Sequence, residues 1–165
     1  MNENLIVSTQ LYASRCELEI TERLGSGKDG TVLVAKRKMA SARVAIKVHR
    51  FEELYFREKL AYERLGRLKI NSIQGFNVPE MTDSDDDLRI LEMTIVERPF
   101  VLDFAAAYLD RRPEFPPEIW AEWEAEKREQ FEDRWPTVQR ILDSFEEVGI
   151  YLTDVSPANI AFSDS

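Results

Sequence analysis

Cysteine is nearly absent from this sequence of 165 residues, in which Cys16 is the only one. A disulfide within the chain and a zinc site built from several cysteines are therefore excluded, and a reducing compartment fits. The first residues, MNENLIVSTQLYAS, lack a basic segment followed by a long apolar one, and no run of 18 apolar residues occurs. We therefore expect neither a signal peptide nor a membrane span, and a cytoplasmic location.

Positive charge is also scarce, since 22 Lys and Arg face 31 Asp and Glu and the net charge is -9. No large basic field is available to neutralise many phosphates, so we expect no nucleic-acid partner and no anionic membrane partner. A single nucleotide needs only a few local cations and backbone N–H groups, and it stays possible. Hydrophobic residues make up 44% of the chain, which is typical of a globular domain.

The pattern of residue types changes near Asp110. Before this residue, alternating and β-branched segments favour strands, and after it helical spacing dominates. The expected strands are 16–24, 31–38, 43–50, 76–82 and 88–96, with an acidic turn at 83–87, and the expected helices are 51–68, 100–109, 118–135 and 136–149. Pro136 suits the first turn of the last helix and Gly149 its end. Hairpins rather than alternating strand–helix units connect the strands, so we expect an α+β fold with an antiparallel sheet.

Three glycines, Gly25, Gly27 and Gly30, have the spacing G-x-G-x-x-G in the segment LGSGKDGTVLVAKRK. In dinucleotide-binding proteins this pattern opens a helix, whereas here the β-branched Thr31 and Val32 indicate that a strand follows. The turn is therefore expected to join two antiparallel strands. It can be a plain hairpin loop, or a hairpin whose backbone N–H groups approach a phosphate.

Lys47 lies in the apolar strand segment VAIK, where Ala45 and Lys47 are expected to share one face. A buried ammonium group is costly unless an anion pairs with it. In the following helix, Glu58 falls within the expected inward stripe, while Glu63 falls on the opposite side. The other members of that stripe are Leu54, Ala61, Leu65 and Leu68. We therefore expect Glu58 to pair with Lys47, or to reach solvent from the rim of the helix.

The segments GSGKDGTV, VAIK and REKLAYERL resemble the N-lobe of the protein kinase-like superfamily. The resemblance implies an N-lobe over residues 1–98, with about five antiparallel strands and one helix, and a reduced, mostly helical C-lobe over 99–165. It implies that Lys47 holds ATP phosphates and is oriented by Glu58. The other nucleotide-binding residues that it implies are Gly25, Ser26, Gly27, Lys28 and Gly30 over the phosphates, and Val32, Ala45, Leu91, Glu92 and Thr94 around adenine. The segment VERP is the alternative position for the adenine-binding hinge.

The segment YLTDVSPANIAF resembles the catalytic loop of the same superfamily, with Asp154 and Asn159 five residues apart. The resemblance implies that Asp154 orients the attacking hydroxyl and that Asn159 holds Mg²⁺. The alternative is an Asx-type turn around Pro157, because Asp, Ser, Pro and Asn are common turn formers.

The sequence departs from the kinase pattern at Leu152, Thr153 and Ser156, and no D-F-G segment follows Asn159. Asp164 is not assigned the role of the missing metal ligand. The resemblance implies an ATP- and Mg²⁺-dependent phosphotransferase acting on a Ser/Thr hydroxyl or a small-molecule hydroxyl. The alternative is an inactive pseudokinase that binds a nucleotide or a protein partner.

The sequence indicates no chemical role for several other features. His49 is expected to be structural or exposed, and the segment 99–104 to serve packing. Trp120, Trp123 and Trp135 are expected to be core or helix-docking anchors rather than a ligand cage. The acidic turn is expected to be a solvated hairpin tip.

Overall fold

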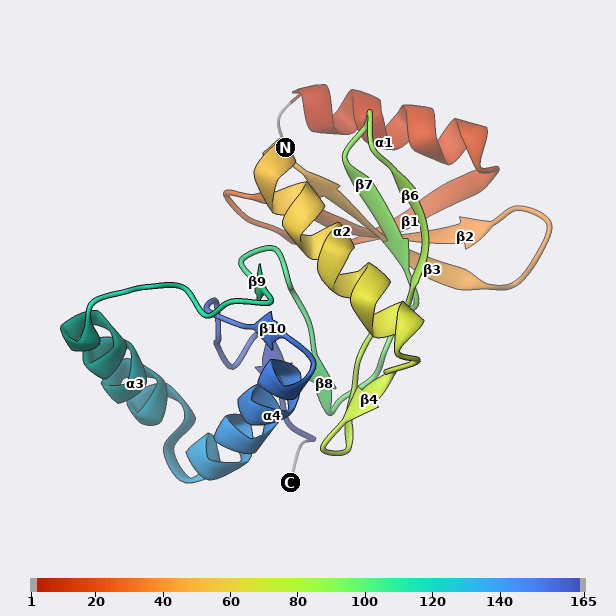
Figure 1. Ribbon diagram of the computed structural model, residues 1–165. Helices are drawn as coiled ribbons and strands as arrows, with labels where there is room; N and C mark the ends of the chain where they lie inside the picture. Colours follow the sequence, from red (N-terminus) through yellow and green to blue (C-terminus); the bar gives the residue numbers. More distant parts are fainter. Residues whose placement is uncertain (1–2, 164–165) are drawn as a thin grey trace.

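The computed structural model describes residues 3–163, and Asp164 therefore lies outside the described residues. Figure 1 shows the sheet and its two helices at one end and two further helices at the other. In chain order the elements are α1 (Glu3–Arg15), β1 (Leu18–Ser26), β2 (Gly30–Arg37), β3 (Arg43–His49), α2 (Glu52–Arg67), β4 (Ser72–Ile73), β5 (Phe76–Asn77), β6 (Met81–Asp85), β7 (Ile90–Met93), β8 (Phe100–Val101), β9 (Tyr108–Leu109), α3 (Pro117–Phe131), the 3₁₀ turn Glu132–Arg134, α4 (Trp135–Glu147), β10 (Ile150–Tyr151) and β11 (Ile160–Ala161).

The main sheet has five strands in the order β1-β2-β3-β7-β6, and every neighbouring pair is antiparallel. The glycine turn connects β1 to β2, and the Gly27 N–H donates to the Gly30 carbonyl at 2.9 Å. The predicted α+β class and the hairpin connections are confirmed. The acidic segment forms the end of β6 and the turn into β7, so the predicted hairpin tip is confirmed as well.

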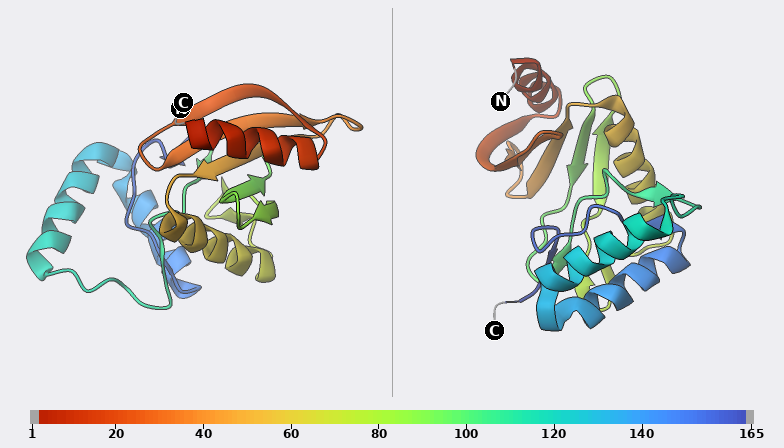
Figure 2. Two further views of the ribbon diagram at one scale, coloured as in Figure 1. Left: turned by 90° about the horizontal axis from the view of Figure 1, so that it is seen from above. Right: turned by 90° about the vertical axis from the view of Figure 1, so that its left-hand side faces the viewer.

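Helices α1 and α2 cover opposite faces of this sheet (Figure 2). Successive side chains of β3 point to opposite faces of the sheet. Val44, Ile46 and Val48 belong to the core under α1, whereas Ala45 belongs to the core under α2. The α1 helix was not predicted. Its inward residues have helical spacing, and the sequence interpretation overlooked them because polar residues interrupt them; they are Leu5, Thr9, Tyr12 and Ala13.

The predicted helix over 100–109 is wrong, because this segment contains β8 and β9 instead. Strand β8 pairs with β11 and β9 pairs with β10, so distant parts of the chain satisfy its backbone groups. Asp103 and Asp110 adopt positive φ angles of 67° and 64°, which an α-helix cannot contain. The helical propensity of the three alanines between them is overridden by these tertiary contacts.

The expected helix ends fit the structure closely in the second half of the chain. Pro136 lies in the first turn of α4, and Gly149 follows the helix with φ +76°. The positive φ favours glycine at this position, and a Cβ at Gly149 would also displace the Arg64 guanidinium, which would lie 2.6 Å from it. In α2, Glu58, Ala61 and Leu65 are buried as predicted, whereas Leu68 at the helix end is 49% exposed. Among the described residues, no helix has the length and apolarity needed to cross a bilayer.

Phe104 links the two halves of the molecule. Its side chain is fully buried, and its ring centroid lies 5.1 Å from Tyr62 of α2 and 5.5 Å from Phe145 of α4. Arg64 adds a bridge by donating to Asp110 at 2.7 and 2.9 Å and to the Gly149 carbonyl at 3.0 Å. The sheet half and the helical half therefore share one core.

We predict that Phe104→Ala lowers the free energy of unfolding by about 3–5 kcal/mol, because it leaves a cavity where the two halves meet. Urea unfolding followed by circular dichroism measures this loss. Phe51→Ala is the control, since Phe51 is 51% exposed and its removal is expected to cost under about 1 kcal/mol. Equal losses in the two variants would contradict the shared core.

Candidate functional site

Lys47 lies between two carboxylates. Its Nζ is 2.8 Å from Oε2 of Glu58 and 2.9 Å from Oδ1 of Asp103, and only 11% of the lysine side chain is exposed. Strand β3 turns Lys47 to the α2 side of the sheet, and α2 aims Glu58 back at the sheet from its inward face. The expected pair of Lys47 and Glu58 is therefore present.

Charge pairing outweighs burial at this pair. Burial alone would lower the pKa of Lys47, but the carboxylates of Glu58 and Asp103 raise it above its ordinary value. Burial alone would raise the pKa of Glu58, but the Lys47 ammonium and the hydrogen bond from His49 lower it to about 2. Both groups are therefore charged at neutral pH.

His49 belongs to the same cluster and is neither exposed nor remote from the site, since only 1% of its side chain is exposed. It shares its face of β3 with Lys47, two residues earlier. Its Nε2 lies 2.5 Å from Oε2 of Glu58 and its Nδ1 lies 3.2 Å from the Arg89 carbonyl. An ionised carboxylate only accepts hydrogen bonds, so the N–H in the contact with Glu58 belongs to Nε2. The period-two pattern of the strand was the signal that could have placed His49 here.

Asp103 is the site residue that sequence reasoning missed. It follows β8, which pairs with β11 directly after Asn159. The backbone N–H of Phe104 donates to Oε1 of Glu58 at 3.2 Å, so the peptide next to Asp103 is tied to the same glutamate. An acidic residue inside the apolar run FVLDFAAA was the available signal, because such a residue needs a partner when buried.

Asp154 and Asn159 lie on one loop that closes over itself. The side-chain amide of Asn159 donates to the Asp154 carbonyl at 3.1 Å, and the N–H of Ile160 donates to the Ser156 carbonyl at 2.9 Å. The expected turn around Pro157 is thus part of the loop, and it leaves the exposed Asp154 carboxylate facing the site. Thr153 fixes the loop by donating to the Ala106 carbonyl at 2.8 Å.

Two adjoining cavities, of about 210 and about 480 Å³, open on this cluster and share part of their lining. The residues that line both are Val32, Lys47, Asp103 and Asn159. The smaller one is the apolar cavity, with Leu24, Ala45, Tyr62 and Met93 among its walls. The larger one is the glycine-turn cavity, and it brings together most of the predicted phosphate and catalytic residues: Gly25, Ser26, Gly27, Lys28, Gly30 and Asp154.

The three glycines of the turn differ in what surrounds them. A Cβ added to Gly30 would lie 2.3 Å from the Val48 carbonyl oxygen, so only glycine allows β2 and β3 to approach this closely. At Gly25 and Gly27 no atom lies within 4 Å of such a Cβ. The backbone of these two residues therefore borders open space at the glycine-turn cavity.

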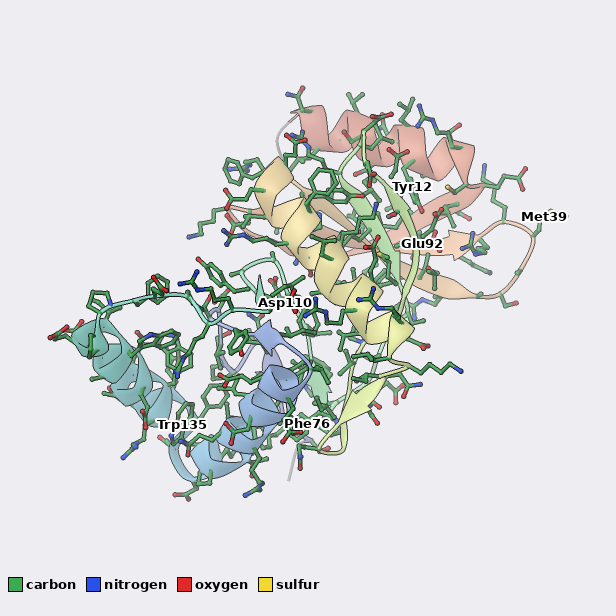
Figure 3. All side chains as sticks on the ribbon, in the orientation of Figure 1. Tyr12, Met39, Phe76, Glu92, Asp110 and Trp135 are labelled. Carbon is green, nitrogen blue, oxygen red and sulfur yellow. The ribbon has the colours of Figure 1, made fainter. Side chains whose placement is uncertain are left out.

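Two of the expected adenine-binding residues are not in either cavity. Leu91 is buried in the core, and Glu92 points to the α1 face, where it binds Arg37 at 2.5 Å and Tyr12 at 3.2 Å (Figure 3). Strand β7 pairs with β3 on one edge and with β6 on the other, so the backbone of these two residues takes part in the sheet ladders. The chain leaves the sheet after Met93, and the apolar cavity is lined by Thr94, Ile95 and Val96. Of these three predicted residues, Thr94 lines the apolar cavity, whereas Leu91 and Glu92 line neither cavity.

Comparison with known proteins gives no family for this chain: no family model matches it, and neither a curated protein nor a solved structure matches it. Among residues 3–163, no group of three or more His, Cys, Asp or Glu side chains is arranged to hold a metal ion. Function must therefore be inferred from the chemistry of the two cavities.

The low pKa of Glu58 predicts a specific loss of stability in acid. Its carboxylate stabilises the fold fully above its ordinary pKa of 4.5, and this contribution is lost as the pH falls toward about 2. The loss amounts to about 3 kcal/mol. Urea unfolding between pH 7 and pH 2 should show a steeper decline for the wild type than for Glu58→Gln, which is less stable at pH 7 but lacks this titration. Glu52→Gln, an exposed change on the same helix, should keep the wild-type profile; parallel profiles for all three proteins would contradict the charge pairing.

Proposed function

We propose that this protein binds ATP with Mg²⁺ in the two adjoining cavities and transfers a phosphoryl group to a hydroxyl. The observation that carries the proposal is the convergence on Lys47 of two carboxylates from separate segments, Glu58 and Asp103, at 2.8 and 2.9 Å. A buried ammonium held in this way beside a glycine hairpin is suited to binding phosphate oxygens.

The cavities fit a nucleotide in shape and polarity. The apolar cavity accommodates a base between Val32 and Ala45 on one side and the segment Thr94–Val96 on the other. The glycine-turn cavity accommodates the phosphates against the backbone of Gly25 and Gly27, with Lys47 in the same lining. Glu58 holds Lys47 in place and is itself bound by His49.

Mg²⁺ is bound in proteins by one or two oxygen ligands together with water and substrate phosphates, so a cluster of three acids is not required. Asp103 and Asn159 line the same wall of the cavity and are the residues that would hold it. The ion supplies charge neutralisation to the phosphates. Asp154 accepts the proton of the attacking hydroxyl or orients it, since its exposed carboxylate opens on the same space.

Asp103 supplies the acidic metal ligand in this proposal. In kinases the D-F-G segment follows the catalytic loop, whereas Leu102, Asp103 and Phe104 precede it in this sequence. The pairing of β8 with β11 places Asp103 beside the loop despite this order. We propose that Asp103 takes the role of the D-F-G aspartate, although it precedes the Asp154 loop in the sequence.

The alternative function is a nucleotide-binding or protein-interaction module that transfers no phosphate. Leu152, Thr153 and Ser156 favour it, because these positions carry other residues in active kinases. The two functions share the nucleotide site and differ in what Asp154 does there.

Thermal unfolding with ATP, with and without Mg²⁺, tests the proposal. Saturating nucleotide at about 100 times its Kd stabilises the folded state by about 2.7 kcal/mol, which raises the Tm by about 5–10 °C for a chain of this size. We expect this rise in the wild type, its loss in Lys47→Ala, and loss of only the Mg²⁺-dependent part in Asp103→Asn. Lys36→Ala, an exposed change on β2, is the matched control and should respond as the wild type.

Release of ADP in the presence of a mixed serine- and threonine-containing peptide pool, with water as the background acceptor, separates the two functions. Asp154→Asn should keep the thermal shift and lose at least about 100-fold in rate. A thermal shift without any transfer, or transfer unchanged in Asp154→Asn, would favour the binding module. Absence of any shift at millimolar ATP would remove the nucleotide site altogether.

A further inference from the structure

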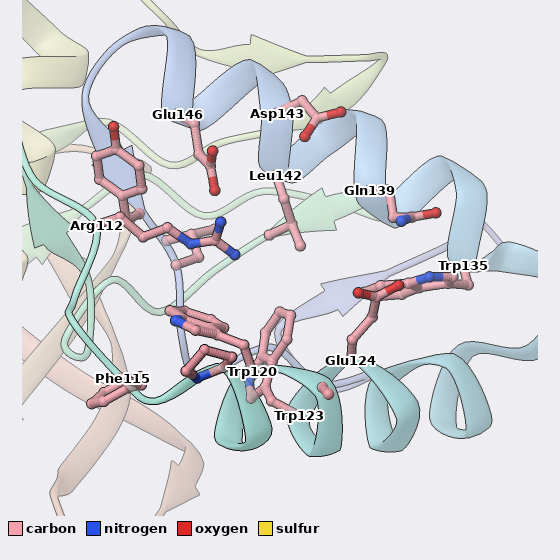
Figure 4. A pocket seen from close by; sticks show the side chains of 14 residues that line it. Arg112, Phe115, Trp120, Trp123, Glu124, Trp135, Gln139, Leu142, Asp143 and Glu146 are labelled. Atoms are coloured by element: carbon pink, nitrogen blue, oxygen red, sulfur yellow. The ribbon is translucent and has the colours of Figure 1, made fainter.

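A second cleft, of about 530 Å³, lies between α3 and α4 and is separate from the proposed nucleotide site (Figure 4). None of the residues assigned to ATP or Mg²⁺ lines it. Its walls include Tyr151 and Leu152, which run into the loop that carries Asp154. We call it the tryptophan cleft, because Trp120, Trp123 and Trp135 all line it.

Two of the three tryptophans have a structural role. Trp135 is 4% exposed, and the indole N–H of Trp123 donates to the Thr153 carbonyl at 3.0 Å. The rings of Trp123 and Trp135 lie 6.3 Å apart and join α3 to α4, as expected of helix-docking anchors. Trp120 extends this row, 5.6 Å from Trp123, and differs in what its face contacts.

The face of Trp120 is covered by a cation from the chain itself. The guanidinium carbon of Arg112 lies 4.2 Å from the centre of the Trp120 ring. Figure 4 shows this guanidinium lying between Trp120 and Glu146. Arg112 is exposed and lies on the segment before α3, so its side chain can leave the cleft without disturbing a helix.

The cleft carries more negative charge than Arg112 neutralises. Three carboxylates line it, Glu124 on α3 with Asp143 and Glu146 on α4. Arg128 pairs with Glu124 at 2.9 Å, so this ion pair and Arg112 together leave a formal charge of −1. Aromatic faces and carboxylates together favour cations, and a guanidinium is suited to both through stacking and paired hydrogen bonds. The lining therefore favours a guanidinium from a ligand, either beside that of Arg112 or in its place.

We propose that the tryptophan cleft binds the arginine side chain of a peptide, with the guanidinium stacked on Trp120 in the place that Arg112 occupies. The incoming group pairs with Glu146, and Arg112 moves out to solvent. The acids also disfavour a ligand that carries its own carboxylate, so arginine within a peptide is preferred to free arginine. This proposal concerns the cleft alone and does not depend on nucleotide binding.

Intrinsic fluorescence tests it, because the three tryptophans of the chain all line this cleft. Titration without nucleotide uses N-acetyl-arginine amide as the probe and N-acetyl-citrulline amide as its neutral counterpart of the same shape. We expect a saturable change with the arginine probe and at least about tenfold weaker binding of the citrulline probe and of free L-arginine.

Three variants sharpen the result. Arg112→Gln removes the internal competitor and should tighten binding of the arginine probe severalfold. Glu146→Gln should weaken it about tenfold. Glu129→Gln, an exposed change on α3 away from this cleft, should leave it unchanged.

Arg112→Gln decides the outcome even where Arg112 masks the cleft in the wild type. Saturable binding of the arginine probe to this variant, with the stated preference over citrulline, supports the proposal. A linear response, equal affinity for the two probes, or loss of binding in Arg112→Gln would overturn it.

Discussion

A buried lysine ammonium fixes the geometry on which the rest of this structure depends. Lys47 on β3 is held by Glu58 from α2 and by Asp103 from the segment after β8, so three distant parts of the chain meet at one cation. An unpaired ammonium at this depth would cost several kcal/mol, which makes the position of each carboxylate a condition of folding. His49 adds a further contact to Glu58 at 2.5 Å. In the proposed function, the same arrangement positions Lys47 for the phosphates of ATP.

The shared core and this charge cluster lie side by side at the junction of the two halves. Phe104 packs between α2 and α4, while its backbone N–H binds Glu58 and its neighbour Asp103 binds Lys47. Packing and charge pairing are therefore coupled through one short segment. Movement of that segment would change both the docking of the helical half and the position of Asp103. A ligand that contacts Asp103 would therefore also affect how the two halves pack.

Local patterns in the sequence were sufficient to predict the pairing of Lys47 with Glu58. The period of two in VAIK and the helical spacing around Glu58 predict the pair of Lys47 and Glu58, because each depends only on neighbouring residues. Asp103 could not be placed in this way, since its position depends on the pairing of β8 with β11, whose residues lie 60 positions apart. Its positive φ also breaks the helix that the alanines after it suggested. Leu91 and Glu92 lie within the buried strand β7, whereas the residues of this segment that line the apolar cavity begin at Met93, where the strand ends.

The proposed function places Lys47, Asp103, Asp154 and Asn159 around the phosphates and metal of one nucleotide. The most direct measurement is the broadening of backbone amide signals by Mn²⁺ in the presence of ATP, since the paramagnetic ion broadens only signals near it. We expect strong broadening at Asp103, Phe104 and Asn159, weaker broadening in the glycine turn, and none in α1. Broadening centred elsewhere, or none that depends on ATP, would contradict this placement.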